Sequence, residues 1–238
     1  MSLVVVSGAA GFIGSHLANR LSSMGQDLAL VDTYAKFEPT RPLRQLRTRV
    51  DLIDTADFPE ALEKGDFRPA AIFHLGACSA TTEKNWNYLQ KNNIEYTKRL
   101  WNWCAEACIP FLYASSAATY GDGSHGFDDR TRPDQLEPLN LYGKSKNDFD
   151  IWALKQVAEG AQVPAHWAGF RFFNVYGPNE IHKGPMASVV WQGFRQAERD
   201  GKIRLFASNT PDWQDGCQER DFVFVEDCVD HLIWHWRF

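Results

Sequence analysis

Residues 3–14 read Leu3-Val-Val-Val-Ser-Gly8-Ala-Ala-Gly11-Phe-Ile-Gly14. A short β-branched run meets three glycines spaced three apart, and an apolar pattern of helical period follows over residues 13–24. Strand, glycine turn and helix in this order predict a backbone that approaches a pyrophosphate at the helix N-terminus. A plain tight turn is the alternative, but three glycines in register favour a dinucleotide site.

Outward from this turn, strands and helices alternate along the chain. We expect further strands at residues 26–32, 50–52, 70–76, 111–116 and 166–175, and helices within 53–66 and at 85–107 and 142–159. This order predicts an α/β fold with a doubly wound parallel sheet of the Rossmann type. The later pattern is looser, with a helix at 187–199, strands at 203–206 and 220–225, and a final helix start. We therefore expect a dinucleotide-binding domain at 1–176, to which 220–232 return, and a small, incomplete substrate-binding region at 177–219.

Composition narrows the classes of partner. The 238 residues carry a net charge of −5 without a basic run, which argues against nucleic acid. No apolar run approaches the ~20 residues of a membrane helix. The five cysteines show neither a disulfide framework nor metal-ligand spacing, so we expect no metal and a reduced, cytoplasmic setting.

Three charged positions at and after the end of the second strand bear on the choice of cofactor. Asp32 follows Gly8 by 24 residues, where an acid usually binds the adenosine ribose hydroxyls of NAD. Lys36 and Arg41 come soon after it and could neutralise the 2′-phosphate of NADP. The residues alone leave NAD and NADP open.

The candidate chemistry lies in residues 139–146, which hold Tyr142 and Lys146 four positions apart. On a helix this spacing places both side chains on one face. A nearby ammonium lowers the pKa of a tyrosine from its usual ~10, so Tyr142 is a candidate acid/base group. The motif alone is common on surface helices, but here it follows a dinucleotide turn and the pair Ser115-Ser116.

Together these pieces resemble the extended short-chain dehydrogenase/reductase superfamily, whose members act on nucleotide-linked sugars. The resemblance implies that Ser116 hydrogen-bonds the reacting oxygen, Tyr142 transfers its proton and Lys146 holds the nicotinamide ribose. Sugar 4,6-dehydratases carry an acidic pair after this position, and Ala117-Ala118 stand here instead, so dehydration is disfavoured.

More specific blocks resemble the branch of ADP-L-glycero-D-manno-heptose 6-epimerases. These blocks are residues 72–79 (IFHLGACS), 110–121 (PFLYASSAATYG), 169–178 (GFRFFNVYGP) and 182–188 (HKGPMAS). The resemblance implies a retained NADP, with NAD as the alternative, an ADP-heptose substrate for the lipopolysaccharide inner core, and a homo-oligomer, a pentamer in this branch. It also makes Lys183 the second acid/base group, because one tyrosine cannot reach the C6 oxygen in both orientations.

The same resemblance implies the binding residues. The cofactor would contact the three glycines of the turn, Tyr142, Lys146, Lys183 and Phe12, Ile13, Asp32, Thr33, Lys36, Leu75, Gly76, Ala77, Cys78, Ser79, Asn92 and Val175. The substrate would contact Ser116, Asn174, Pro185, Gln192, Phe206, Ala207, Ser208, Asn209 and Arg220.

Three features depart from the branch. Pro185 stands where we expect a hydroxyl and Gln192 where we expect a histidine, and the loop over residues 210–218 is longer. Members of the branch also continue for several dozen residues, so we expect a fragment whose last helix lacks part of its packing surface. A UDP-sugar 4-epimerase, which needs only Tyr142, and a non-catalytic nucleotide-sensing protein on this fold are the competing interpretations.

Overall fold

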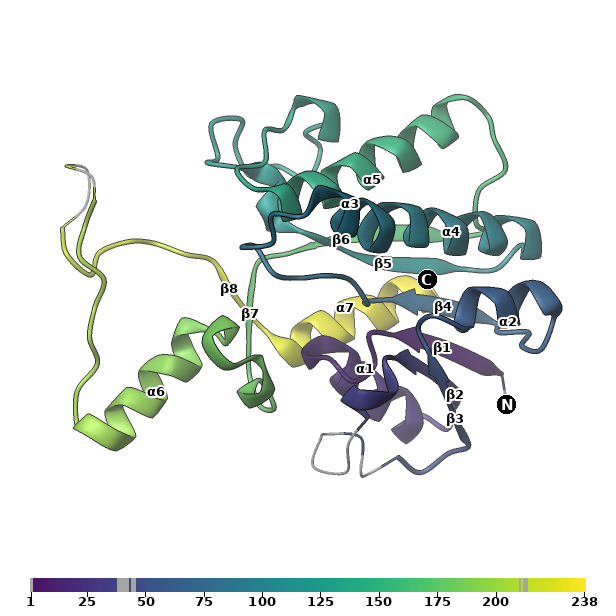
Figure 1. The fold of residues 1–238 in the computed structure, drawn as a ribbon, viewed down its shortest axis with the longest axis horizontal. Coiled ribbons are helices and arrows are strands. Elements are labelled where there is room, and N and C mark those ends of the chain that lie inside the picture. Colours follow the sequence, from purple (N-terminus) through teal and green to yellow (C-terminus); the bar gives the residue numbers. More distant parts are fainter. Residues whose placement is uncertain (1, 38–42, 44–45, 210, 212–213) are drawn as a thin grey trace.

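The computed structural model describes residues 2–37, 43, 46–209, 211 and 214–238. Its centre is a six-stranded parallel sheet with the strand order β3-β2-β1-β4-β5-β6 (Figure 1). The strands are β1 Leu3–Ser7, β2 Asp27–Asp32, β3 Val50–Asp54, β4 Ala71–His74, β5 Phe111–Ser116 and β6 Trp167–Phe172. The order reverses between β1 and β4, and the predicted doubly wound fold is confirmed.

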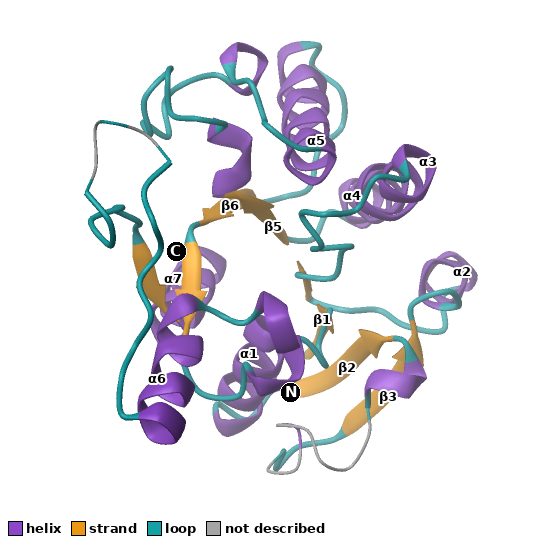
Figure 2. Cartoon of the chain, turned by 60° about the vertical axis from the view of Figure 1, so that its left-hand side comes forward, coloured by secondary structure: helices purple, strands orange, loops and turns teal. Residues whose placement is uncertain are grey.

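Helices cover both faces of the sheet (Figure 2). They are α1 Phe12–Ser23, α2 Phe58–Lys64, α3 Trp86–Leu89, α4 Tyr96–Ala107, α5 Leu141–Ala158 and α7 Val225–Arg237, whereas α6 Val189–Asp200 lies away from the sheet. Side chains alternate along β1, so Val5 packs towards α2, α4 and α5 whereas Val4 and Val6 pack towards α1 and α7. Both faces are therefore dry, as a parallel sheet requires.

Three predicted elements differ in the structure. The strand expected at 166–175 is divided into β6 of the main sheet and β7 Asn174–Tyr176 of a separate two-stranded sheet. The helix expected at 85–107 consists of α3, a π-helical segment Gln90–Glu95 and α4 in direct succession. The strand expected at 203–206 is wrong, because this stretch is irregular and Leu205 and Phe206 are 70% and 69% exposed. An apolar run becomes a strand only where a neighbouring strand can pair with it, and 203–206 has no such neighbour among the described residues.

After β6 the chain leaves the sheet and later returns to it. A short parallel pair, β7 Asn174–Tyr176 with β8 Phe222–Phe224, carries the chain out to α6 and back (Figure 1). Helix α7 then returns to the sheet, where Trp236 packs edge-on against Phe73 at 5.7 Å between ring centroids. Across the described part of the chain, no helix is both long and apolar enough to cross a membrane.

Candidate active site

The glycine turn between β1 and α1 leaves no room for side chains. Gly8 has φ +71°, and a Cβ there would lie 2.6 Å from the backbone nitrogen of Gly76. A Cβ on Gly14 would lie 2.1 Å from the Gly8 carbonyl oxygen. Gly11 caps α1 without a side-chain hydrogen bond, and the first turn holds no acidic residue. The amides of this helix end are thus left for an anion, so the turn fits a dinucleotide pyrophosphate.

Asp32 ends β2 beside this turn and is buried. Its Oδ2 accepts a hydrogen bond from the Ala10 amide at 3.2 Å, and its Oδ1 accepts one from the Thr33 amide at 2.9 Å. The exposed Lys36 places its Nζ 2.9 Å from the same Oδ1. Arg41, the other cation considered for a 2′-phosphate, lies outside the described residues.

Ser116, Tyr142 and Lys146 meet at the carboxyl end of β5. Asn140 caps α5 by accepting a hydrogen bond from the Gly143 amide at 2.8 Å, which fixes the turn that carries Tyr142. The Ser116 hydroxyl is hydrogen-bonded to the Tyr142 side chain. Lys146 is buried, and its Nζ donates to the carbonyl oxygen of Ala114 at 2.8 Å.

The expected lowering of the Tyr142 pKa by Lys146 is wrong for this structure. Burial raises the pKa of Tyr142, and the hydrogen bond from Ser116 opposes that rise. The ammonium of Lys146 is directed at Ala114 on β5, and burial lowers the pKa of Lys146 to about 8. Ser116 is thus the neighbour that favours the phenolate here.

A residue that sequence reasoning missed lies one turn beyond Lys146. Asp150 is buried and accepts hydrogen bonds from the Tyr113 hydroxyl at 2.9 Å and the Ser115 hydroxyl at 2.7 Å. Its charge raises the pKa of Lys146 and so opposes the effect of burial. The signal was available, since Tyr142, Lys146 and Asp150 follow one another at intervals of four on α5.

Lys183 approaches from the opposite side, in the short 3₁₀ segment Ile181–Met186. Its Nζ lies 5.1 Å from the centroid of the Phe12 ring, in the first turn of α1. Partial burial lowers the pKa of Lys183, and the carboxylate of Glu180 acts against that. The ammonium therefore lies over the first turn of α1 and is partly shielded from water.

The glycine turn and the candidate catalytic side chains border one cavity of about 1260 Å³. Its wall includes the three glycines, the catalytic candidates Ser116, Tyr142, Lys146 and Lys183, and most other predicted binding residues, namely Phe12, Ile13, Asp32, Thr33, Lys36, Leu75, Gly76, Ala77, Cys78, Ser79, Asn92, Asn174, Val175, Phe206, Ala207, Asn209 and Arg220.

Three predicted substrate residues, Pro185, Gln192 and Ser208, are not part of this wall. The Gln192 amide instead donates to the carbonyl oxygens of Pro185 and Ala187 at 3.0 and 2.8 Å. The backbone amide of Ser208 donates to Asp215 Oδ1 at 2.7 Å. Among the residues that the structure describes, no group of three His, Cys, Asp or Glu side chains is placed to hold a metal ion.

Known proteins resemble the chain over nearly its whole length. An ADP-L-glycero-D-manno-heptose-6-epimerase of Fusobacterium nucleatum is 46% identical over 98% of this chain and 70% of its own length. The enzyme of the same name from Nitratidesulfovibrio vulgaris is 44% identical over 98% of this chain and 71% of its own.

A solved structure resembles the fold as well. The crystal structure of the Helicobacter pylori ADP-L-glycero-D-manno-heptose-6-epimerase superposes with a TM-score of 0.82 at 26% identity, over 99% of this chain and 73% of that one. The predicted resemblance is thereby confirmed. The sequence profile of the NAD-dependent epimerase/dehydratase family matches residues 4–237, and the chain belongs to that family.

Proposed function

We propose that this chain inverts C6 of ADP-D-glycero-D-manno-heptose to give ADP-L-glycero-D-manno-heptose, with bound NADP. One observation carries the proposal: two proton-transfer groups, Tyr142 and Lys183, border one cavity from different elements beside the glycine turn. Inversion through a transient 6-ketone needs a group for each orientation of the C6 oxygen. The names of the relatives from Fusobacterium and Nitratidesulfovibrio support the same substrate.

Each candidate catalytic side chain is assigned a role from its position in the cavity. When bound, the nicotinamide cofactor supplies the hydride acceptor and donor for C6. Tyr142 takes up and returns the proton of the C6 oxygen in one orientation, with the Ser116 hydroxyl beside its phenol oxygen. Lys183 exchanges it in the other orientation, and its lowered pKa suits a base that works near neutral pH. Lys146 would hold the nicotinamide ribose of the bound cofactor.

NADP is proposed over NAD on the strength of Lys36. Its ammonium is exposed, and its ion pair within the described residues is with Asp32, so it can turn towards a 2′-phosphate. Asp32 meanwhile keeps the backbone of the turn in place through the Ala10 and Thr33 amides.

The substrate is proposed to lie against residues 177–219, with 1–176 and the returning 220–232 as the dinucleotide-binding domain. Packing supports this division, because α7 contributes Val229 and Leu232 to the same core as β1 and α1. Asn174, Arg220 and residues 206–209 would contact the ADP-heptose. Pro185 and Gln192 would act indirectly, by shaping the segment that carries Lys183. A homo-oligomer stays a prediction, which light scattering after size-exclusion chromatography would test.

The test is to incubate the protein with ADP-D-glycero-D-manno-heptose and NADP and to follow the C6 configuration by NMR. Lys183→Met and Tyr142→Phe should each lower turnover by about 10²-fold or more, as expected for loss of a proton-transfer group. Lys155→Met, at an exposed lysine near the end of α5, is the matched control and should not change turnover.

Two results would reject the proposal. Inversion of a UDP-sugar at C4 that is indifferent to Lys183→Met would indicate a 4-epimerase. Protein that binds nucleotide but inverts neither substrate would indicate a sensing role.

A further inference from the structure

The segment that carries Lys183 has little internal structure of its own. Residues 177–188 link β7 to α6, and the 3₁₀ turn within them is interrupted at Gly184 (φ +53°, ψ −125°) and holds Pro185. Its backbone hydrogen bonds include Lys183 N to Glu180 O at 2.9 Å and Ala187 N to Gly184 O at 3.1 Å. A turn this short does not fix a side chain, so contacts from outside the turn must hold Lys183 over Phe12.

Glu180, which directly precedes the 3₁₀ turn, supplies such contacts. Its side chain is 2% exposed. One carboxylate oxygen accepts hydrogen bonds from the Gly177 amide at 3.2 Å and the Ser188 hydroxyl at 2.8 Å, and the other accepts one from the Ser188 amide at 2.6 Å. The carboxylate thereby joins the two ends of the segment, and Lys183 lies in the closed loop between them.

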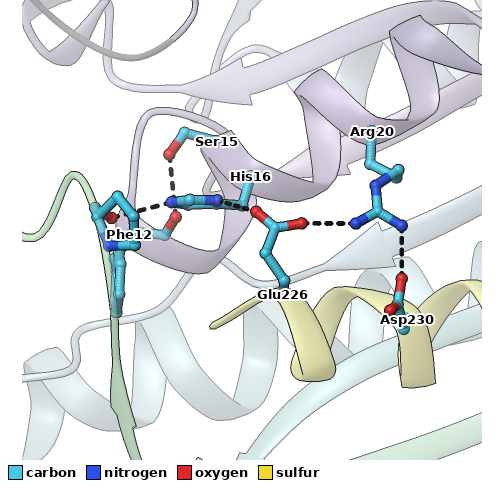
Figure 3. A network of polar contacts seen from close by, with 7 residues as sticks. Phe12, Ser15, His16, Arg20, Glu226 and Asp230 are labelled. Carbon is cyan, nitrogen blue, oxygen red and sulfur yellow. Dashed lines mark hydrogen bonds and ion pairs between the residues drawn. The ribbon is translucent and has the colours of Figure 1, made fainter. Parts of the chain in front are cut away.

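The start of the segment is anchored to the helices that flank the glycine turn. His16 on α1 is 2.9 Å from the Pro178 carbonyl oxygen through Nε2 and 2.5 Å from Glu226 Oε1 through Nδ1. Figure 3 shows Glu226, on α7, continuing this network to Arg20 and Asp230. The ring of His16 also packs edge-on against Phe12, the residue that Lys183 faces.

We propose that Glu180 is the positioning residue of Lys183, holding its amine towards the glycine turn by tying Gly177 to Ser188. This rests on the proposed role of Lys183 in proton transfer. Glu180 acts in two separable ways: its three hydrogen bonds set where the amine lies, and its negative charge acts on the amine's protonation.

Glu180→Gln changes both effects while keeping the size of the side chain. An amide has a single acceptor oxygen, so its NH₂ must face one of the three donors, and the loop loosens. A misplacement of this kind should lower kcat by about 10- to 100-fold. The KM for the cofactor should change less than kcat, because the glycine turn and Asp32 are untouched. The lost charge should also lower the pKa of Lys183 further, so the Lys183 limb of the pH–rate profile should move to lower pH.

Two conservative variants separate position from charge. Glu180→Asp and Ser188→Ala each keep the carboxylate charge but weaken the tie, through a shorter reach or the loss of one donor. Both should lower kcat less than Glu180→Gln does, with the Lys183 limb at its original pH. Glu106→Gln, at an exposed glutamate of α4, is the matched control and should leave kcat and the pH profile unchanged.

Competitive labelling of lysine amines, read by mass spectrometry across pH, measures Lys183 without relying on turnover. Labelling of Lys183 should follow a lower pKa in Glu180→Gln than in the parent protein or in Glu180→Asp. If Glu180→Gln fails to fold, Glu180→Asp and Ser188→Ala still decide the matter through their kcat values.

The inference is overturned if folded Glu180→Gln keeps the parental kcat, pH profile and labelling curve. It is also overturned if Glu180→Asp and Ser188→Ala both turn over like the parent. In either case a loss of turnover in Lys183→Met would leave the proposed function standing. Turnover that survives Lys183→Met would reject the proposed function itself.

Discussion

Replacing Lys146 by methionine should make the folded protein more stable at neutral pH while removing turnover. Burial lowers the pKa of Lys146 from 10.5 to about 8. At ~1.4 kcal/mol per pH unit, this corresponds to roughly 3 kcal/mol by which the buried ammonium destabilises the fold at pH 7. Methionine is uncharged and avoids this destabilisation, but it leaves the Ala114 carbonyl without its hydrogen-bond donor, which costs about 1–2 kcal/mol. The expected net gain is about 1 kcal/mol, or ~2–4 °C in Tm for a chain of this size.

The pH dependence of the stability difference between the parent protein and Lys146→Met tests whether the buried ammonium causes that difference. Below pH 8 Lys146 is protonated in both the folded and the unfolded protein, so the full penalty applies. Between pH 8 and 10.5 the folded protein releases this proton while the unfolded chain keeps it, and stability therefore rises with pH. The Met variant lacks this rise, so the two stability curves should cross within that window. Above it the variant should be the less stable protein.

Urea denaturation at a series of pH values from 6 to 10.5 measures both curves. Lys155→Met, at an exposed lysine on the same helix, is the matched control and should shift stability by less than about 0.5 kcal/mol at every pH. The reasoning fails if Lys146→Met is destabilised by the same amount across the whole range. That result would mean the ammonium is fully compensated where it lies.

Three further predictions follow from the geometry. Gly8→Ala should abolish NADP binding or folding, because its Cβ would overlap the Gly76 backbone; Gly25→Ala, at φ +80° with open space, should lower stability by only about 1 kcal/mol in urea denaturation. Trp101→Ala, at a fully buried ring, should lower the free energy of unfolding by about 3–5 kcal/mol in the same assay. Lys36→Ala should weaken NADP binding several-fold and leave NAD binding nearly unchanged in calorimetric titrations, and equal losses would contradict the proposed 2′-phosphate contact.

The sheet could be predicted because each of its strands can be recognised from the residues within it. The β-branched run before Gly8 predicts a buried strand, because buried parallel strands are continuously apolar and a glycine turn follows this run directly. The stretch at 203–206 looks the same by composition but does not form a strand, because strand formation depends on a partner that a local pattern does not reveal.

Most residues that border the cavity could be predicted from the sequence, but the electrostatic environment of the charged ones could not. The spacing of Tyr142 and Lys146 indicates their shared helix face, yet not that the ammonium turns to Ala114. That choice depends on β5, more than twenty residues away along the chain. Glu180 was missed for the same reason: nothing in its neighbours indicates that both of its oxygens fold back onto Gly177 and Ser188.

The two proposed acid/base groups differ in what holds them, and this predicts where the enzyme tolerates change. Tyr142 sits on an 18-residue helix with a capped N-terminus and a face buried in the larger core. Displacing it means disturbing that core, so its position should fail only when the fold does. Lys183 depends on one carboxylate and one histidine contact at the edge of the cavity. Substitutions there can misplace the amine while the sheet stays intact, so loss of inversion without loss of stability should map to residues 177–188 and to His16.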